Sequence, residues 1–193
     1  INEFLAEKSD QSQDTKRLAT NRELAFRGTE VRGEGFILSP EVAKEFIRKN
    51  PQNARVLFPY LGGEDLNTDP EHRPSRWVIN FHEWPLGEAE KFPELLAILT
   101  EKVKPYRDSI TKQIHEPDYW KFWDKRTANY KRISALNRVL VCAAISPTNA
   151  VTFIKPGIVF QNKIIIFPFN KGSHFSILQS SIHWEWVRMF TST

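Results

Sequence analysis

The chain has 193 residues and carries 27 Lys or Arg side chains against 23 Asp or Glu, which gives a formal net charge of +4. Its 40% hydrophobic and 26% charged content are ordinary for a globular protein, and the small positive excess is compatible with an anionic partner. The single cysteine, Cys142, excludes an internal disulfide and a thiolate metal cluster, and no apolar segment approaches the roughly 18 residues of a membrane-spanning helix.

The first 25 residues differ from the rest of the chain. Residues 1–25 are polar and show neither a helical stripe nor strand alternation, so we interpret them as an arm or linker from an upstream domain. Residues 26–193 are long enough to bury a core of their own. The chain begins with Ile1 and its single methionine is Met189. We therefore expect a fragment of a longer intracellular protein without a signal peptide.

The first half of the domain should alternate short strands with helices. Residues 31–38 (VRGEGFIL) predict a strand, and Ser39 followed by Pro40 is typical of a helix start. That helix should end by Asn50, because Pro51 disfavours helical geometry in the residue before it. Further strands are expected at 55–60 and 76–81, with a loop at 62–75 between them.

The second half begins with a helix and continues with strands. Apolar spacing predicts a helix from Pro93 that Lys104-Pro105 should end or kink. Short apolar strands separated by turns then predict a β-meander over 139–145, 151–154, 158–160 and 163–169. A final helix capped by Ser173 should place apolar side chains on one face, namely Phe175, Leu178, Ile182, Trp186 and Met189. Together these elements predict an α+β domain with a mixed or antiparallel β-meander and packed helices.

The motifs of several enzyme classes are absent from the sequence. It has neither a GxGxxG nor a GxxxxGK[ST] phosphate loop, and it lacks the Asn/Asp-Pro-Pro-Tyr tetrapeptide of adenine N6 methyltransferases. The five histidines show no metal-binding spacing. An (Asp/Glu)-x-Lys triplet occurs at 14–16 in the polar arm, where it cannot preorganise a metal site. We therefore assign no catalytic and no metal-binding residue.

The stretch 58–85 is the most unusual in the chain, because an apolar segment, a glycine turn, an acidic loop and an arginine-bearing strand follow one another there. The acidic pair at 64–65 has the chemistry to bind a cation, but acidic loop residues more often cap turns or pair with nearby arginines. We favour a structural turn tied to Arg73 or Arg76. Asn67 and Arg76 are among the groups in this stretch that can bond to a ligand.

Residues 101–138 hold ten Lys or Arg against five Asp or Glu, interleaved with aromatic side chains. This composition favours nucleic-acid contact, because Lys and Arg neutralise phosphates and release counterions. The alternative is a solvated helix face whose aromatics lie in the core, and we prefer it for Trp120 and Trp123. Both interpretations stay open for the cations Lys125, Arg126, Lys131, Arg132 and Arg138.

A polar turn at 146–149 lies between two predicted strands. Loops held on a rigid scaffold often carry recognition, so Ser146, Thr148 and Asn149 are further candidates for DNA contact. The alternative is an ordinary hairpin turn, and from spacing alone we prefer it.

Several segments together resemble the region that follows the catalytic domain in large adenine-specific DNA methyltransferases. The similarity is to type IIL (type IIG-like) restriction–modification enzymes and related class I DNA methylases, and it covers about residues 26–190 in colinear order. In that family this region is the target recognition domain. The segments are FPYLGGEDLN, RPSRWVINFHEWPLGEAEKFPELLAILTEKVKP, NRVLVCAAIS, GIVFQNKIIIFPF and HFSILQSSIHWEWVRMF.

The resemblance implies a sequence-specific DNA-binding domain that positions double-stranded DNA, so that an absent catalytic domain can flip out and methylate one adenine. It implies S-adenosylmethionine as the cofactor of the parent enzyme, Mg²⁺ if the parent also cleaves DNA, and neither in this fragment. It implies duplex DNA and the upstream methyltransferase domain as partners, in the cytoplasm of a bacterium or archaeon and without a membrane. Because it places the stretch 58–85 in a recognition domain, it makes Asn67 and Arg76 candidates for DNA contact.

One departure from relatives concerns the strand after VLV, where relatives tend to show arginines and this chain has the residues 142–145, CAAI. If those arginines contact DNA in relatives, this chain must use other residues or read another sequence. Two other functions stay open. In the first, the domain is a scaffold that joins catalytic domains without reading bases. In the second, it is a freestanding enzyme, and the absence of catalytic motifs argues against this function.

Overall fold

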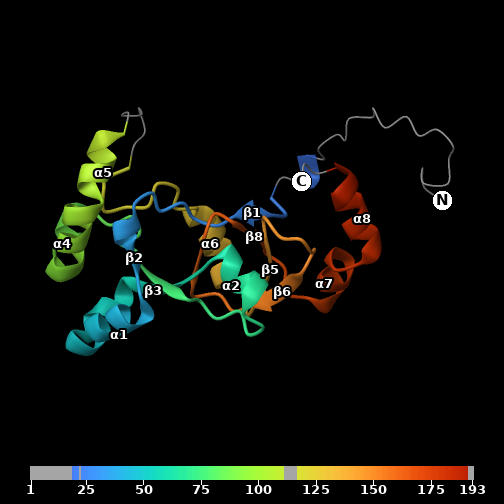
Figure 1. Cartoon of the computed structure of the whole chain (residues 1–193), viewed down its shortest axis with the longest axis horizontal. Helices are drawn as coiled ribbons and strands as arrows, with labels where there is room; N and C mark the ends of the chain where they lie inside the picture. The colour runs from blue at the N-terminus through green and yellow to red at the C-terminus, as the bar shows by residue number, and fades with distance from the viewer. Residues whose placement is uncertain (1–18, 22, 111–116, 191–193) are drawn as a thin grey trace.

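The computed structural model describes residues 19–21, 23–110 and 117–190. These residues form two four-stranded sheets with helices packed around them, so the predicted α+β class is confirmed. Figure 1 shows α1, α4 and α5 at one end of the molecule and α7 and α8 at the other, with the strands between them. Most of the predicted arm, including its triplet at 14–16, lies outside the described residues. No described helix is long and apolar enough to cross a membrane.

The first sheet has the strand order β2-β4-β3-β7. β3 pairs antiparallel with β4, where Tyr60 lies opposite Arg76, and parallel with β7, where Leu61 lies opposite Phe160. The strands predicted near 55–60 and 76–81 are therefore confirmed as β3 and β4. The bounds are Ile37–Leu38 (β2), Leu57–Leu61 (β3), Arg76–Ile79 (β4) and Val159–Phe160 (β7).

Helices cover the first sheet, and the two that the sequence predicts, α1 and α4, begin where it predicts them. Ser39 caps α1, because its Oγ accepts a hydrogen bond from the Val42 backbone N at 3.3 Å. A separate helix starts at Lys104, so the break expected at Lys104-Pro105 is confirmed. The helical bounds are Pro40–Lys49 (α1), Leu86–Ala89 (α3), Pro93–Lys102 (α4) and Lys104–Ser109 (α5), with 3-10 turns at Ala19–Asn21 (η2), Glu34–Phe36 (η3) and Pro51–Arg55 (η4).

The strand predicted over 31–38 is wrong for most of its length. Only Ile37–Leu38 pair in the sheet, and a 3-10 turn that buries Phe36 precedes them. The glycines explain the bend. Gly33 has a φ of 141°, a conformation that L side chains rarely adopt, and Gly35 packs so closely on Lys102 that a Cβ there would overlap it.

The second sheet has the strand order β1-β8-β5-β6, with antiparallel pairing throughout. Different helices cover its two faces. Side chains alternate across each strand, so neighbouring residues of β5 pack against different helices. Val141 clusters with Ile133 of α6 on one face, whereas Leu140 clusters with Phe175 and Leu178 of α7 on the other. The bounds are Phe26–Arg27 (β1), Val139–Ala143 (β5), Val151–Ile154 (β6), Ile164–Phe167 (β8), Thr127–Ser134 (α6), Gly172–Leu178 (α7) and Ser181–Phe190 (α8).

β7 joins the two sheets and departs from a simple meander, since it pairs with β3 rather than with its neighbours in sequence. Hydrogen bonds from distant residues hold it there. The Phe160 carbonyl O accepts from Thr29 N at 2.8 Å and from Thr29 Oγ1 at 2.9 Å, and Phe160 N donates to the Tyr130 hydroxyl at 2.8 Å. Burial raises the pKa of Tyr130 to about 12, although its bonds with Thr29 and Phe160 oppose the shift.

The predicted final helix is two helices, α7 and α8. Ser173 does not cap the first, whose N-cap is Lys171. Ser180 restarts the second, because its Oγ accepts a hydrogen bond from His183 N at 3.2 Å. Two separate helices carry the five apolar residues, so the predicted common apolar face is wrong. Ile182 is 83% exposed and Trp186 is 51% exposed.

Candidate nucleic-acid interface

The loop predicted at 62–75 contains a helix, α2, over Gly63–Thr68. Asp65 ties the two ends of this segment together and is only 5% exposed. Its Oδ2 accepts from Gly62 N at 2.6 Å and its Oδ1 accepts from Ser75 N at 3.3 Å. Asp65 thus fixes α2 against the start of β4 by using both carboxylate oxygens on backbone donors.

The predicted pairing of the acidic pair at 64–65 with Arg73 or Arg76 is wrong. Arg73 instead pairs with Asp69 at 2.9 Å and with Glu71 at 3.2 Å. Its hydrogen bonds hold the pKa of Asp69 at about 2. Among the described residues, no carboxylate of this segment forms an ion pair with Arg76.

Arg76 begins β4 and extends its side chain across the neighbouring strand β3. The guanidinium lies 5.5 Å from the ring centroid of Tyr60, which is itself buried. Nη2 lies over Gly62, at a point that a side chain there would occupy. Within the described residues this half-buried guanidinium makes no ion pair and no hydrogen bond. An arginine always carries its charge, so Arg76 offers five unused N–H donors at this surface.

Asn67 connects α2 to the hairpin between β5 and β6. Its Nδ2 donates to the Ile145 carbonyl O at 3.2 Å, so two of the predicted candidate groups lie together. Within the hairpin the Ser146 Oγ accepts from Thr148 N at 3.3 Å. We call Gly62, Asn67, Arg76, Ser146 and Thr148 the α2 surface.

Asn149 points away from the α2 surface. Its Nδ2 donates to the Leu178 carbonyl O at 2.8 Å and lies 3.3 Å from Nδ1 of His183. The side chain therefore holds the hairpin against the turn between α7 and α8. Thr148 and Asn149 also line a hollow of about 320 Å³ beside Trp184.

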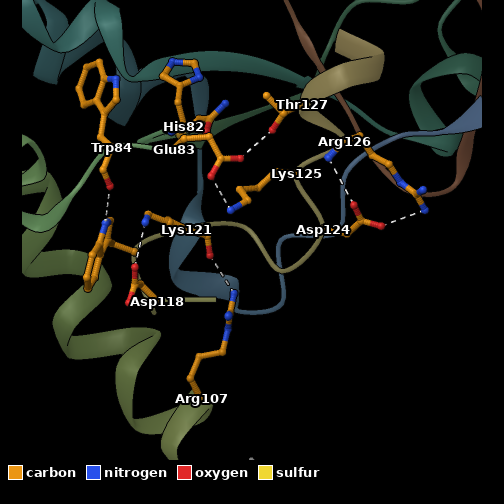
Figure 2. A network of polar contacts seen from close by, with 12 residues as sticks. His82, Glu83, Trp84, Arg107, Asp118, Lys121, Asp124, Lys125, Arg126 and Thr127 are labelled. Atoms are coloured by element: carbon orange, nitrogen blue, oxygen red, sulfur yellow. Dashed lines mark hydrogen bonds and ion pairs between the residues drawn. The ribbon is translucent and has the colours of Figure 1, made fainter. Parts of the chain in front are cut away.

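The cations around α6 are largely neutralised by acidic neighbours. Figure 2 shows Glu83 between Lys125 and Thr127, which donate to it at 2.7 and 2.8 Å. Burial is the largest single influence on Glu83 and raises its pKa, but these two hydrogen bonds and the charges of nearby lysines together outweigh burial and leave the pKa below its usual value. Arg126 pairs in the same way with Asp124 at 2.9 Å.

One side of α6 forms a hollow of about 310 Å³ against residues 23–27. Arg126, Asn129 and Arg132 line it from the helix. Arg132 Nη1 donates to the Glu23 carbonyl O at 3.2 Å and lies 3.8 Å from the Glu23 carboxylate. Arg27 lines the hollow from β1, so three arginines share this concave surface, which we call the α6 hollow and which suits a phosphate group.

The other side of α6 borders a cavity of about 440 Å³ that β3 and β7 of the first sheet also line. Its lining is mainly apolar and includes Phe58, Phe122 and Ile158, with Lys131 among the polar residues. Lys131 is exposed, and in the described ranges its ammonium has no carboxylate partner. Of the cations predicted around α6, Lys125, Arg126 and Arg132 have acidic partners, whereas Lys131 has none among the described residues.

Arg138 is separate from these groups. Its guanidinium lies 3.8 Å from the ring centroid of Phe153, and its Nε donates to the Asn170 carbonyl O at 3.0 Å. Phe153 belongs to the sheet face that α7 covers. Arg138 therefore stabilises that face and does not join the α2 surface or the α6 hollow.

A family model described as the MmeI target recognition domain matches residues 11–192. The chain belongs to this family. The resemblance that the sequence motifs indicate is confirmed, and the chain is a target recognition domain. A search of curated proteins found no match.

The structure of the type IIL restriction–modification enzyme MmeI in complex with DNA resembles this MmeI-family domain. The TM-score is 0.69, with 19% identity over 92% of this chain, which shows a shared fold. The match covers 23% of that enzyme, so the domain spans less than a quarter of its length.

Several polar residues lie at the candidate sites of this MmeI-family domain although the sequence does not predict a role for them. Arg27 and Asn129 line the α6 hollow, and Gln161 lies against Gly62 beside Arg76. Composition around Arg27 and Gln161 is unremarkable, so only the strand pairing that brings them to these sites indicates a role. Within the described ranges no group of three or more His, Cys, Asp or Glu side chains has the geometry to hold a metal ion.

Proposed function

We propose that this domain recognises a specific sequence in double-stranded DNA and that the α2 surface reads the bases. The observation that carries the proposal is Arg76, a half-buried guanidinium with no acidic partner among the described residues. The neighbouring Arg73, by contrast, is paired with Asp69 and Glu71. Arginine donating two hydrogen bonds to guanine is the commonest specific contact in the major groove, and asparagine at position 67 adds a group suited to adenine.

The basic groups beside α6 would hold the DNA backbone. Lys131 is exposed and unpaired within the described chain, and Arg126 and Arg132 line one hollow. A phosphate entering that hollow would compete with Asp124 and Glu23 for these guanidiniums. Such contacts fix the register of a protein on the duplex, while base contacts specify the sequence.

Family membership supports a larger parent enzyme. We place the domain in a cytoplasmic bacterial or archaeal enzyme that methylates adenine with S-adenosylmethionine supplied to a separate domain, with Mg²⁺ required if that enzyme also cleaves DNA. In this arrangement the domain presents the duplex, and the catalytic domain flips out the target base.

Equilibrium binding to a randomised duplex pool tests the proposal. The protein should enrich a defined motif from the pool at low and moderate salt, and its affinity should fall as salt rises, because counterions are released from the phosphates. Single-stranded oligonucleotides of the same pool are the control and should bind without a motif. If the protein and its full-length parent both bind the pool without enriching a motif, the domain is a scaffold.

A further inference from the structure

We propose that Gln161 is a further specificity-determining residue, which reads a base edge next to the one that Arg76 reads. This inference rests on the proposed function and identifies a second reading residue at the same surface. The evidence is the row of residues that the first sheet places side by side at the end of β3.

Three adjacent strands build this row. Arg76 begins β4, Gly62 follows the last residue of β3, and Gln161 follows the last residue of β7. A Cβ on Gly62 would overlap Arg76 Nη2 and would lie 3.1 Å from Gln161 Oε1. The two side chains therefore converge over the bare Cα of the glycine between them.

The backbone of Gln161 is fixed on both sides. Its N donates to the Leu61 carbonyl O at 2.9 Å, and its carbonyl O accepts from Ile164 N at 2.9 Å. It also forms a parallel bridge with Thr29. The Cα is thus held by both sheets, which leaves little freedom except in the side chain itself.

The side-chain amide of Gln161 is unused. In the described part of the chain neither its Oε1 nor its Nε2 makes a hydrogen bond, although the residue is half-buried. Amides that serve the fold normally bond to backbone or side chains, as the buried Asn53 and the half-buried Asn149 do here. A fixed backbone with an unused amide is the arrangement that a reading residue requires.

The chemistry of the pair suits adjacent bases. Arg76 supplies only donors, which match O6 and N7 of guanine, whereas Gln161 supplies one donor group and one acceptor, which match N7 and N6 of adenine. Because both side chains end against Gly62, they would reach bases separated by about one step of 3.4 Å along the helix axis.

Motif selection with variants of Gln161 tests the inference. Gln161→Ala should lose the preference at one position by roughly 5- to 150-fold, the discrimination that one good bidentate contact gives. Gln161→Glu keeps the size and removes the donor, so its preference there should move from adenine to cytosine. Asn162→Ala, in the same turn, is the matched control and should keep the wild-type motif.

The outcomes separate this inference from the function on which it rests. A wild-type protein that enriches no motif overturns both. A wild-type motif that Gln161→Ala and Gln161→Glu reproduce without change overturns only the role of Gln161. The thermal midpoints of the variants identify any that fail to fold, and Gln161→Glu, which keeps the shape of the side chain, then decides the matter.

Discussion

The end of the Arg76 side chain lies over the bare Cα of Gly62, in space that any other residue at position 62 would fill. Gly62 is buried and has an ordinary extended backbone, with φ of −103°. The glycine is therefore required by the approach of the guanidinium and not by its own conformation. This relationship links the glycine turn of the sequence directly to the position of Arg76.

Replacing Gly62 with alanine should displace the Arg76 guanidinium. The atom in conflict is the far end of a flexible side chain, so we expect a loss of less than about 1 kcal/mol in the free energy of unfolding. Specific binding should weaken by about tenfold, because the reading group is moved. Gly63→Ala is the matched control, since its Cβ would meet only ordinary contacts at 3.6 Å and beyond. Equal duplex affinities for the two variants would contradict the account.

Asp65→Ala should destabilise the domain by about 1–3 kcal/mol, because the buried Gly62 N loses its acceptor and Ser75 N, in an exposed residue, loses one as well. Urea unfolding measures the change. Asp65→Asn retains one acceptor oxygen and should lose less. Should Asp65→Ala unfold at the wild-type urea concentration, the carboxylate does not hold α2 in place.

Tyr130 should make the domain sensitive to alkaline pH. Its pKa is raised from 10.0 to about 12 in the folded state, so the unfolded chain loses the proton first. The resulting stability is fully present below pH 10 and is lost as pH rises toward 12, by about 2–3 kcal/mol.

The matched variant is Tyr130→Phe. It starts less stable, because Phe160 N loses its acceptor, but it should lose less further stability between pH 8 and 11.5. Some decline will remain, since burial also raises the pKa of Tyr60 and Cys142. If urea unfolding shows that the two proteins lose the same free energy of unfolding between pH 8 and 11.5, Tyr130 does not have this role.

The local elements of this fold are predictable, and the contacts that build the interface are not. Ser39-Pro40 predicts the start of α1 because the cap is made by residues three apart. The sequence does not predict α2, because its six residues are too few to show a helical repeat. Its N-terminus is also held by a bond from the Gly62 backbone N to Asp65, which no typical N-cap side chain signals. β7 is placed by a bond from Thr29 to Phe160, 131 residues apart.

The candidate site shows the same division. The sequence predicts Asn67 and Arg76 because both lie in a stretch of unusual chemistry. It leaves open which cations around α6 are paired, since Glu83 and Glu23 lie far from Lys125 and Arg132 in the chain. Gln161 enters the site only through the parallel pairing of β3 with β7.

Lys131→Ala should weaken binding to all duplexes alike. Removing one phosphate contact should reduce the slope of log affinity against log salt by about 1 and leave the enriched motif unchanged. Lys91, which pairs with Glu88 at 2.6 Å in the other half of the molecule, provides the control variant Lys91→Ala. A salt slope that Lys131→Ala leaves intact would show that this cation does not contact DNA.

The most direct test of the central claim is motif selection from a randomised duplex pool with Arg76→Ala. Arg73→Ala is the matched control, because Arg73 lies three residues away, is 70% exposed and is already paired with Asp69 and Glu71. Arg76→Ala should lose the preference for one base pair, a cost of about 1–3 kcal/mol, while the other positions of the motif persist. Arg73→Ala should enrich the wild-type motif. If Arg76→Ala also enriches the wild-type motif with wild-type affinity, the α2 surface does not read DNA.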